Sequence, residues 1–104
     1  MAAKLLVLYN HPTDSAVFDG YYSETHTPIA KTLPGVRSFV VSTGPIAAPD
    51  GSRSPYHQIA EFTFHSMADL QAALSSSAGR TTAGDLRNFA GAGVTLVTYE
   101  TREA

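Results

Sequence analysis

The sequence predicts one domain of the α+β class, with strands and helices in the order β-α-β-β-α-β. The chain has 104 residues, 43% of them hydrophobic, and no cysteine. This composition fits a single domain with its own core and without disulfides or a Cys-based metal site. Short apolar segments that end at proline or glycine indicate strands, and apolar residues at three- and four-residue spacing indicate helices.

The N-terminal third predicts a strand followed by a helix. The strand covers residues 4–10, which are rich in Leu and Val and are followed by a proline turn. Asp14 is placed to cap a helix over roughly residues 15–32, where apolar side chains recur at helical spacing. Pro28 lies inside this helix and crowds the carbonyl group four residues earlier. We therefore expect the helix to kink or break near His26.

The middle of the chain predicts two strands joined by a long surface loop. Residues 36–43 alternate with a period of two, and so do residues 56–65. The loop 44–55 between them is rich in proline and glycine. If this loop closes a hairpin, the two strands are antiparallel, with the side chains of Ala60, Phe62 and Phe64 on one face of the sheet.

The C-terminal third predicts a short helix, an irregular segment and a last strand. Ser66 begins a variant of the capping box, and the helix that follows it ends in the serines at 75–77. Residues 81–89 are expected to form one or two irregular helical turns. The last strand covers residues 92–99.

This order of elements is the split-βαβ, or ferredoxin-like, arrangement, with both helices on one face of a four-stranded antiparallel sheet. The whole chain, 1–104, is expected to form one such domain. The second, third and fourth strands carry apolar residues on both faces, yet the helices cover only one. We therefore expect the open face of the sheet to be buried against a second copy, which makes the protein a homodimer.

Charge and hydropathy exclude several kinds of partner. The net charge is −2 and the isoelectric point is about 6.0, so a nucleic acid or an anionic membrane is not an expected partner. The longest apolar run, Leu5–Tyr9, is too short for a membrane span or a signal peptide. The sequence therefore predicts a cytoplasmic protein.

Several motifs, taken in order over about residues 5–98, resemble the EthD family. They are Leu8-Tyr9, Pro12-x-Asp14, Phe18-x-x-Tyr21-Tyr22-x-x-x-His26-x-Pro28, Leu33-Pro34-Gly35, Pro55-Tyr56, Glu61-x-x-Phe64 and Gly84-Asp85-x-x-Asn88-Phe89. The family, named from an accessory protein of ethyl tert-butyl ether degradation, consists of small dimeric α+β barrel proteins. Its wider superfamily includes a muconolactone-type isomerase, polyketide dehydratases or decarboxylases, and cofactor-free oxygenases. The resemblance implies the fold and the dimer but does not choose a reaction.

His26 is the main candidate for a catalytic residue, with Tyr22 one helical turn before it. An imidazole gains and loses a proton near neutral pH, which suits general acid/base catalysis. His26 also matches the His-x-Pro motif of the family. The alternative is that His26 caps the kinked helix by bonding a freed carbonyl group. Tyr22 would donate to a substrate oxygen or hold the His26 ring, whereas Tyr21 lies on another face and is expected to pack.

A ligand pocket is expected between the helices and the sheet, and it suits a small apolar or aromatic molecule. Its predicted lining is aromatic and consists of Tyr9, Phe18, Tyr22, Phe39, Phe62, Phe64 and Phe89. The family pattern suggests that Asp85 and Asn88 help to close the rim of the pocket. From the residues alone, both are equally well interpreted as N-cap and turn residues.

The remaining polar candidates do not indicate a metal or a nucleotide. His11, His57 and His65 show no short ligand spacing, so no metal site is predicted. The sequence has no glycine-rich phosphate loop, and no cofactor is expected. Glu61 lies within a strand and either lines a cavity or pairs with a basic residue such as Arg37 on the neighbouring strand.

Three functions are compatible with these residues. The first is a cofactor-independent lyase or isomerase, less readily an oxygenase, in which His26 moves a proton on a small cyclic or aromatic-derived substrate. The second is a non-catalytic accessory protein that binds a hydrophobic intermediate in the same pocket. The third is a purely structural dimer. The pairing of His26 with Tyr22 favours the first two, but neither the substrate nor the reaction can be read from the sequence.

Overall fold

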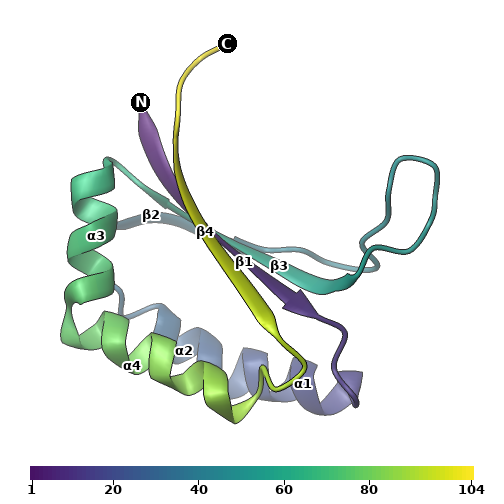
Figure 1. Ribbon diagram of the computed structural model, residues 1–104. Helices are drawn as coiled ribbons and strands as arrows, with labels where there is room; N and C mark the ends of the chain where they lie inside the picture. The colour runs from purple at the N-terminus through teal and green to yellow at the C-terminus, as the bar shows by residue number, and fades with distance from the viewer.

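The computed structural model describes all 104 residues as a four-stranded antiparallel sheet with every helix on one of its faces (Figure 1). The strands lie in the order β2-β3-β1-β4. This is the ferredoxin-like α+β arrangement predicted from the sequence. The chain termini lie at the same end of the sheet, because the start of β1 pairs with the end of β4.

The two central strands, β1 (Ala2–Asn10) and β3 (Tyr56–Phe64), carry most of the core. Side chains alternate between the faces of a strand, so alternate residues of β1 are buried under the helices. Ala60, Phe62 and Phe64 share that face of β3, as predicted. The β1 residues between the buried ones, such as Leu6 and Leu8, point to the face that carries no helix.

The first helical segment is continuous but changes its winding at the predicted place. It consists of α1 (Ser15–Tyr21), the π-helical turn η1 (Tyr22–His26) and α2 (Thr27–Ala30). In the π turn the backbone N–H of Thr27 donates to the carbonyl of Tyr22, five residues earlier. This wider turn accommodates the ring of Pro28, which would crowd the carbonyl four residues before it in an α-helix. The irregularity near His26 is therefore a bulge in the winding rather than a break.

Two details of this helix correct the sequence prediction. The helix ends at Ala30, two residues before the predicted end. Val17, which fits the apolar stripe by its spacing, is 67% exposed. The Asp14 side chain accepts from the backbone N–H of Val17, so the predicted N-cap is confirmed.

The next strand, β2 (Val36–Val41), forms the predicted antiparallel hairpin with β3. Simple alternation would place Val36 and Phe39 on opposite faces. They lie on the same face, because a β-bulge between Val36 and Ser38 shifts the register by one residue. The loop 44–55 extends beyond the ends of β2 and β3 as a long arm (Figure 1).

The second helical layer differs most from its prediction. After α3 (Met67–Ser75), a regular helix α4 (Ser77–Asp85) begins, and the short 3-10 turn η2 (Leu86–Asn88) follows. The serines that end α3 also start α4, because the Ser76 side chain accepts from the backbone N–H of Gly79. The sequence of α4 is rich in weak helix formers, and its packing on α2 and α3 stabilises it.

The last strand, β4 (Val94–Thr101), forms the edge of the sheet beside β1. It begins and ends two residues later than the predicted strand 92–99. It is exposed along most of its length, and Val97 is 42% exposed on the open face. On that face Glu61 pairs with a basic residue, which was one of its two expected roles, but the partner is Lys4 of β1, at 3.6 Å, rather than Arg37. No helix in the structure has the length and apolar character needed to cross a membrane.

Candidate functional site

The imidazole of His26 is buried in the interior and is bonded to a carboxylate. Its Nδ1 lies 2.8 Å from Oδ2 of Asp85, and the two residues are 2% and 7% exposed. The carboxylate can only accept, so Nδ1 carries the proton of this bond. The other ring nitrogen, Nε2, has no hydrogen-bond partner in the chain. His26 therefore does not cap a backbone carbonyl, which was the structural alternative to a role in the pocket.

Asp85 is held by three donors, two from the first helical segment and one from η2. Besides His26, it accepts from the Tyr21 hydroxyl at 2.6 Å and from the Asn88 amide at 2.8 Å. Burial alone raises the pKa of Asp85, but the hydrogen bonds from Tyr21, Asn88 and His26 outweigh it and lower the pKa below its ordinary value. The group is therefore a carboxylate at neutral pH, and its bond fixes His26 with the proton on Nδ1.

Tyr21 belongs to this network, although its place in the sequence predicted only packing. Its hydrogen bond to Asp85 raises the pKa of Tyr21, because deprotonation would remove the bond and place two negative charges side by side. Asp85 and Asn88 do not form the rim of the pocket. They lie behind His26, where they hold its ring in place.

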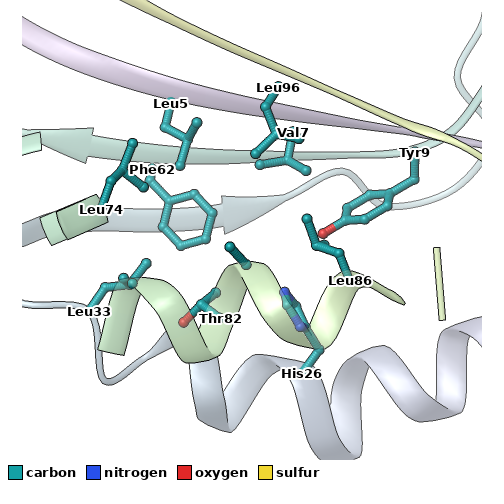
Figure 2. A pocket seen from close by; sticks show the side chains of 12 residues that line it. Leu5, Val7, Tyr9, His26, Leu33, Phe62, Leu74, Thr82, Leu86 and Leu96 are labelled. Carbon is teal, nitrogen blue, oxygen red and sulfur yellow. The ribbon is translucent and has the colours of Figure 1, made fainter. Parts of the chain in front are cut away.

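A cavity of about 40 Å³ lies between the sheet and the helices α3 and α4, with His26 in its wall (Figure 2). This volume holds about two or three water molecules. The lining is mostly aliphatic and consists of Leu5, Val7, Tyr9, His26, Leu33, Phe62, Leu74, Gly79, Thr82, Ala83, Leu86 and Leu96. Leu96 on the edge strand β4 is 47% exposed, so the cavity reaches the surface beside this strand.

Only two of the seven aromatic residues predicted to line the pocket do so, namely Tyr9 and Phe62. Three others pack behind Tyr9 in an aromatic cluster with His26, whose ring centre is 4.6 Å from that of Phe89 and 5.3 Å from that of Tyr22. The remaining two lie further along the sheet, one on β2 and one on β3. Those three cluster residues are Phe18, Tyr22 and Phe89, and the remaining two are Phe39 and Phe64.

Two buried tyrosine hydroxyls lie close to the candidate base. The hydroxyl of Tyr9 points into the cavity (Figure 2). Burial, with a smaller contribution from the neighbouring Tyr22, raises the pKa of Tyr9 far above its ordinary value, and burial also raises that of Tyr22. The Tyr22 hydroxyl is buried without a hydrogen-bond partner and does not bond His26. Tyr9, rather than Tyr22, is therefore the hydroxyl donor placed at the cavity.

The other polar candidates lie outside this cavity. His57 pairs with Asp19 at 2.7 Å, and His65 is exposed at the end of β3. Glu61 lies on the open face of the sheet in its pair with Lys4. No three His, Asp or Glu side chains come together in a group that could hold a metal ion.

Comparison with known families identifies the group of proteins to which this chain is related. The sequence model described as the EthD domain matches residues 10–93. The chain belongs to the EthD family. This EthD-family protein is 35% identical over 94 residues to an uncharacterised 11.0 kDa protein from the thcB-thcC intergenic region of Rhodococcus erythropolis. That alignment covers 90% of this chain and 89% of the relative.

Solved structures agree with this assignment. An EthD family protein from Bacillus halodurans superimposes with a TM-score of 0.88 and 31% identity, over 98% of this chain and 100% of the other. More distant proteins share the fold alone. A hydroxynitrile lyase from Passiflora edulis has a TM-score of 0.75 at 16% identity (99% and 95% covered). A dimeric ferredoxin-like protein of unknown function from Jannaschia has a TM-score of 0.69 at 21% identity (97% and 100% covered).

Sequence reasoning about this EthD-family chain identified His26 but not the group that holds it. Tyr21 and Asp85 are 64 residues apart, and no local pattern indicates that they meet. The α4 residues that line the cavity, Gly79, Thr82 and Ala83, were also missed, because their segment does not have the sequence pattern of a regular helix.

Proposed function

We propose that this EthD-family protein is a cofactor-independent lyase or isomerase in which His26 transfers a proton on a small cyclic or aromatic-derived substrate. The observation that supports this proposal is the bond between His26 Nδ1 and the buried carboxylate of Asp85. It leaves Nε2 as a proton acceptor at the wall of an apolar cavity. A histidine held in this way by a carboxylate is a recurring arrangement for a general base.

In the proposed reaction, Nε2 of His26 accepts a proton from a carbon next to a carbonyl group of the substrate. The carboxylate of Asp85 stabilises the imidazolium that forms, and the three hydrogen bonds of Asp85 keep it in place. The hydroxyl of Tyr9, which burial keeps protonated, donates to the developing enolate oxygen. Return of the proton from Nε2 to a different atom completes an isomerisation, and its delivery to a leaving group completes an elimination.

Substrate entry requires the cavity to widen, because about 40 Å³ is too small for a ring. The helix α4 packs mainly on α2 and α3 and makes few contacts with the sheet. Opening between α4 and β4 therefore disrupts little of the main core. The exposed side chain of Leu96 marks the entrance in this proposal.

The test measures proton transfer without knowledge of the natural substrate. Small cyclic ketones and lactones are incubated with the protein in D₂O, and deuterium uptake next to the carbonyl is followed by mass spectrometry. We expect His26→Gln to lower the rate of exchange by about 10²- to 10⁴-fold, the usual contribution of a general base. His65→Gln is the matched control, because His65 is exposed and distant from the cavity.

An exchange rate that His26→Gln leaves unchanged would refute the role of His26 as a base. If the wild type binds these compounds but catalyses no exchange, the accessory function is the better description. The mostly apolar lining of the cavity favours this second candidate, a protein that holds a hydrophobic intermediate without reacting with it.

We also propose that the protein is a homodimer formed through the open face of the sheet. Leu6, Leu8, Val97 and Tyr99 lie on this face, and no helix of the same chain covers it. An apolar surface of this kind on one side of a sheet indicates an interface. The dimeric ferredoxin-like protein with the same fold supports this arrangement.

A further inference from the structure

A second group of polar side chains lies at the base of the loop 44–55, away from the cavity beside His26. It surrounds a cleft of about 360 Å³. The residues that line the cleft come from the end of β1, the start of α1, both ends of the loop and the start of β3. They are His11, Ser15, Gly44, Pro45, Ile46, Arg53, Tyr56 and His57. None of them is acidic.

The two histidine rings of this cleft are held in place by hydrogen bonds, whereas the guanidinium of Arg53 has no partner. His11 Nε2 donates to the backbone carbonyl of Ser54 at 2.9 Å, and His57 Nε2 is anchored by Asp19 at 2.7 Å. The ring centres of His11 and His57 lie 5.9 Å apart. The guanidinium of Arg53 forms neither a salt bridge nor a side-chain hydrogen bond, so a cation with planar, paired donors is available at the cleft.

The backbone of β3 turns His57 towards this cleft. The register between β1 and β3 shifts at Tyr9/Asn10, which leaves His57 as the extra residue of a β-bulge. Bulges of this kind redirect a side chain, and they are common beside binding sites. The next residue, Gln58, has a buried amide nitrogen without a partner, in a hollow that shares Gly44 and His57 with the cleft. The unpartnered donors of this region are therefore the Arg53 guanidinium in the cleft and the Gln58 amide in the adjoining hollow, which the Asp19 carboxylate also lines.

We infer that this cleft binds the carboxylate group of a small organic acid, with Arg53 as its charged anchor. A guanidinium matches a carboxylate with two parallel hydrogen bonds. Asp19 offsets part of the positive charge, which favours a singly charged carboxylate over a phosphate dianion. Pro45 and Ile46 provide an apolar wall for the carbon part of the ligand. The site is separate from the cavity of the proposed reaction, and its argument does not depend on that reaction.

The test is a titration with benzoate at about 0.15 M salt, a concentration that screens weak surface binding. Binding is followed by the side-chain NMR signals of the histidines. We expect saturable shifts of the His11 and His57 signals, with little change at His26. Benzamide, which has the same shape without the charge, serves as the neutral probe and should not bind, and inorganic phosphate should bind more weakly than benzoate.

Arg53→Gln should weaken benzoate binding by at least tenfold, since a hydrogen bond to a charged group is lost. Arg37→Gln, at an exposed arginine on β2, is the matched control and should bind as the wild type does. The melting temperature of each variant shows that it is folded. Equal affinity of Arg53→Gln and the wild type, the absence of saturable shifts, or a preference for phosphate over benzoate would each overturn the inference.

Discussion

Replacement of Asp85 by Asn tests the centre of the candidate site with almost no change in shape. The carboxylate accepts three hydrogen bonds, two at Oδ1 and one at Oδ2. An amide offers only one oxygen. If that oxygen faces Tyr21 and Asn88, the NH₂ group faces His26, whose Nδ1 must then accept instead of donate. The proton of the ring moves to Nε2, and the cavity loses its base.

The cost follows from the number of bonds affected. A hydrogen bond to a charged group contributes about 1.5–3 kcal/mol and a neutral bond about 0.5–1.5 kcal/mol. One bond is lost or reversed and two lose their charge, so Asp85→Asn should lower the free energy of unfolding by about 2–4 kcal/mol. For a domain of this size, that lowers the melting temperature by roughly 10–25 °C. A chain of about 100 residues has enough stability to remain folded at 20 °C.

The assay combines thermal unfolding at pH 7 with ¹⁵N NMR of the histidine rings, in which the two neutral tautomers give different signals. Asp50→Asn is the matched control, because Asp50 is exposed in the loop and bonds only Ser52. It should leave the melting temperature nearly unchanged. A melting temperature of Asp85→Asn equal to that of the wild type, with His26 in its original tautomer, would refute the assignment of the network.

The same pair of proteins should differ in their response to acid. The folded-state pKa of Asp85 lies below its ordinary value of 3.8. The stability from this group is therefore complete above that value and is lost as the pH falls through it towards the folded-state pKa. The difference in melting temperature between the wild type and Asp85→Asn should shrink from pH 6 to pH 3. A difference that stays constant over this range would contradict the network.

Two further predictions concern the fold and the assembly. Gly79→Ala should destabilise the protein by about 1–3 kcal/mol, since a Cβ would collide with the carbonyl oxygens at the end of α3. Gly20 has open space around it, so Gly20→Ala should stabilise α1 by about 0.5–1 kcal/mol. Denaturant unfolding measures both, and effects of the same sign would contradict the packing of α4 on α3. Val97→Lys should convert the proposed dimer into a monomer of 11.0 kDa in sedimentation, whereas Val17→Lys, on the exposed side of α1, should not. A wild type that already sediments as a monomer, or a Val97→Lys variant that stays dimeric, would refute the interface.

Local patterns were sufficient for the order of elements and for two of the helix starts. Alternation in β3 placed Ala60, Phe62 and Phe64 on one face, because side-chain direction in a strand depends only on position. Asp14 and Ser66 cap the helices that follow them, because a cap bonds a backbone group three residues away. Pro28 identified the irregular turn, although not its π-helical form.

The tertiary structure decided the partner of His26, the existence of α4 and the face on which Phe39 lies. His26 and Asp85 are 59 residues apart, and only the packing of the two helical segments brings them together. Most residues of α4 are weak helix formers, so its stability depends mainly on packing against the neighbouring helices. The bulge that turns Phe39 towards the core depends on the register with β3, which is a property of two strands together. Such contacts cannot be predicted from the sequence of a single segment, because their energy arises only when distant segments meet.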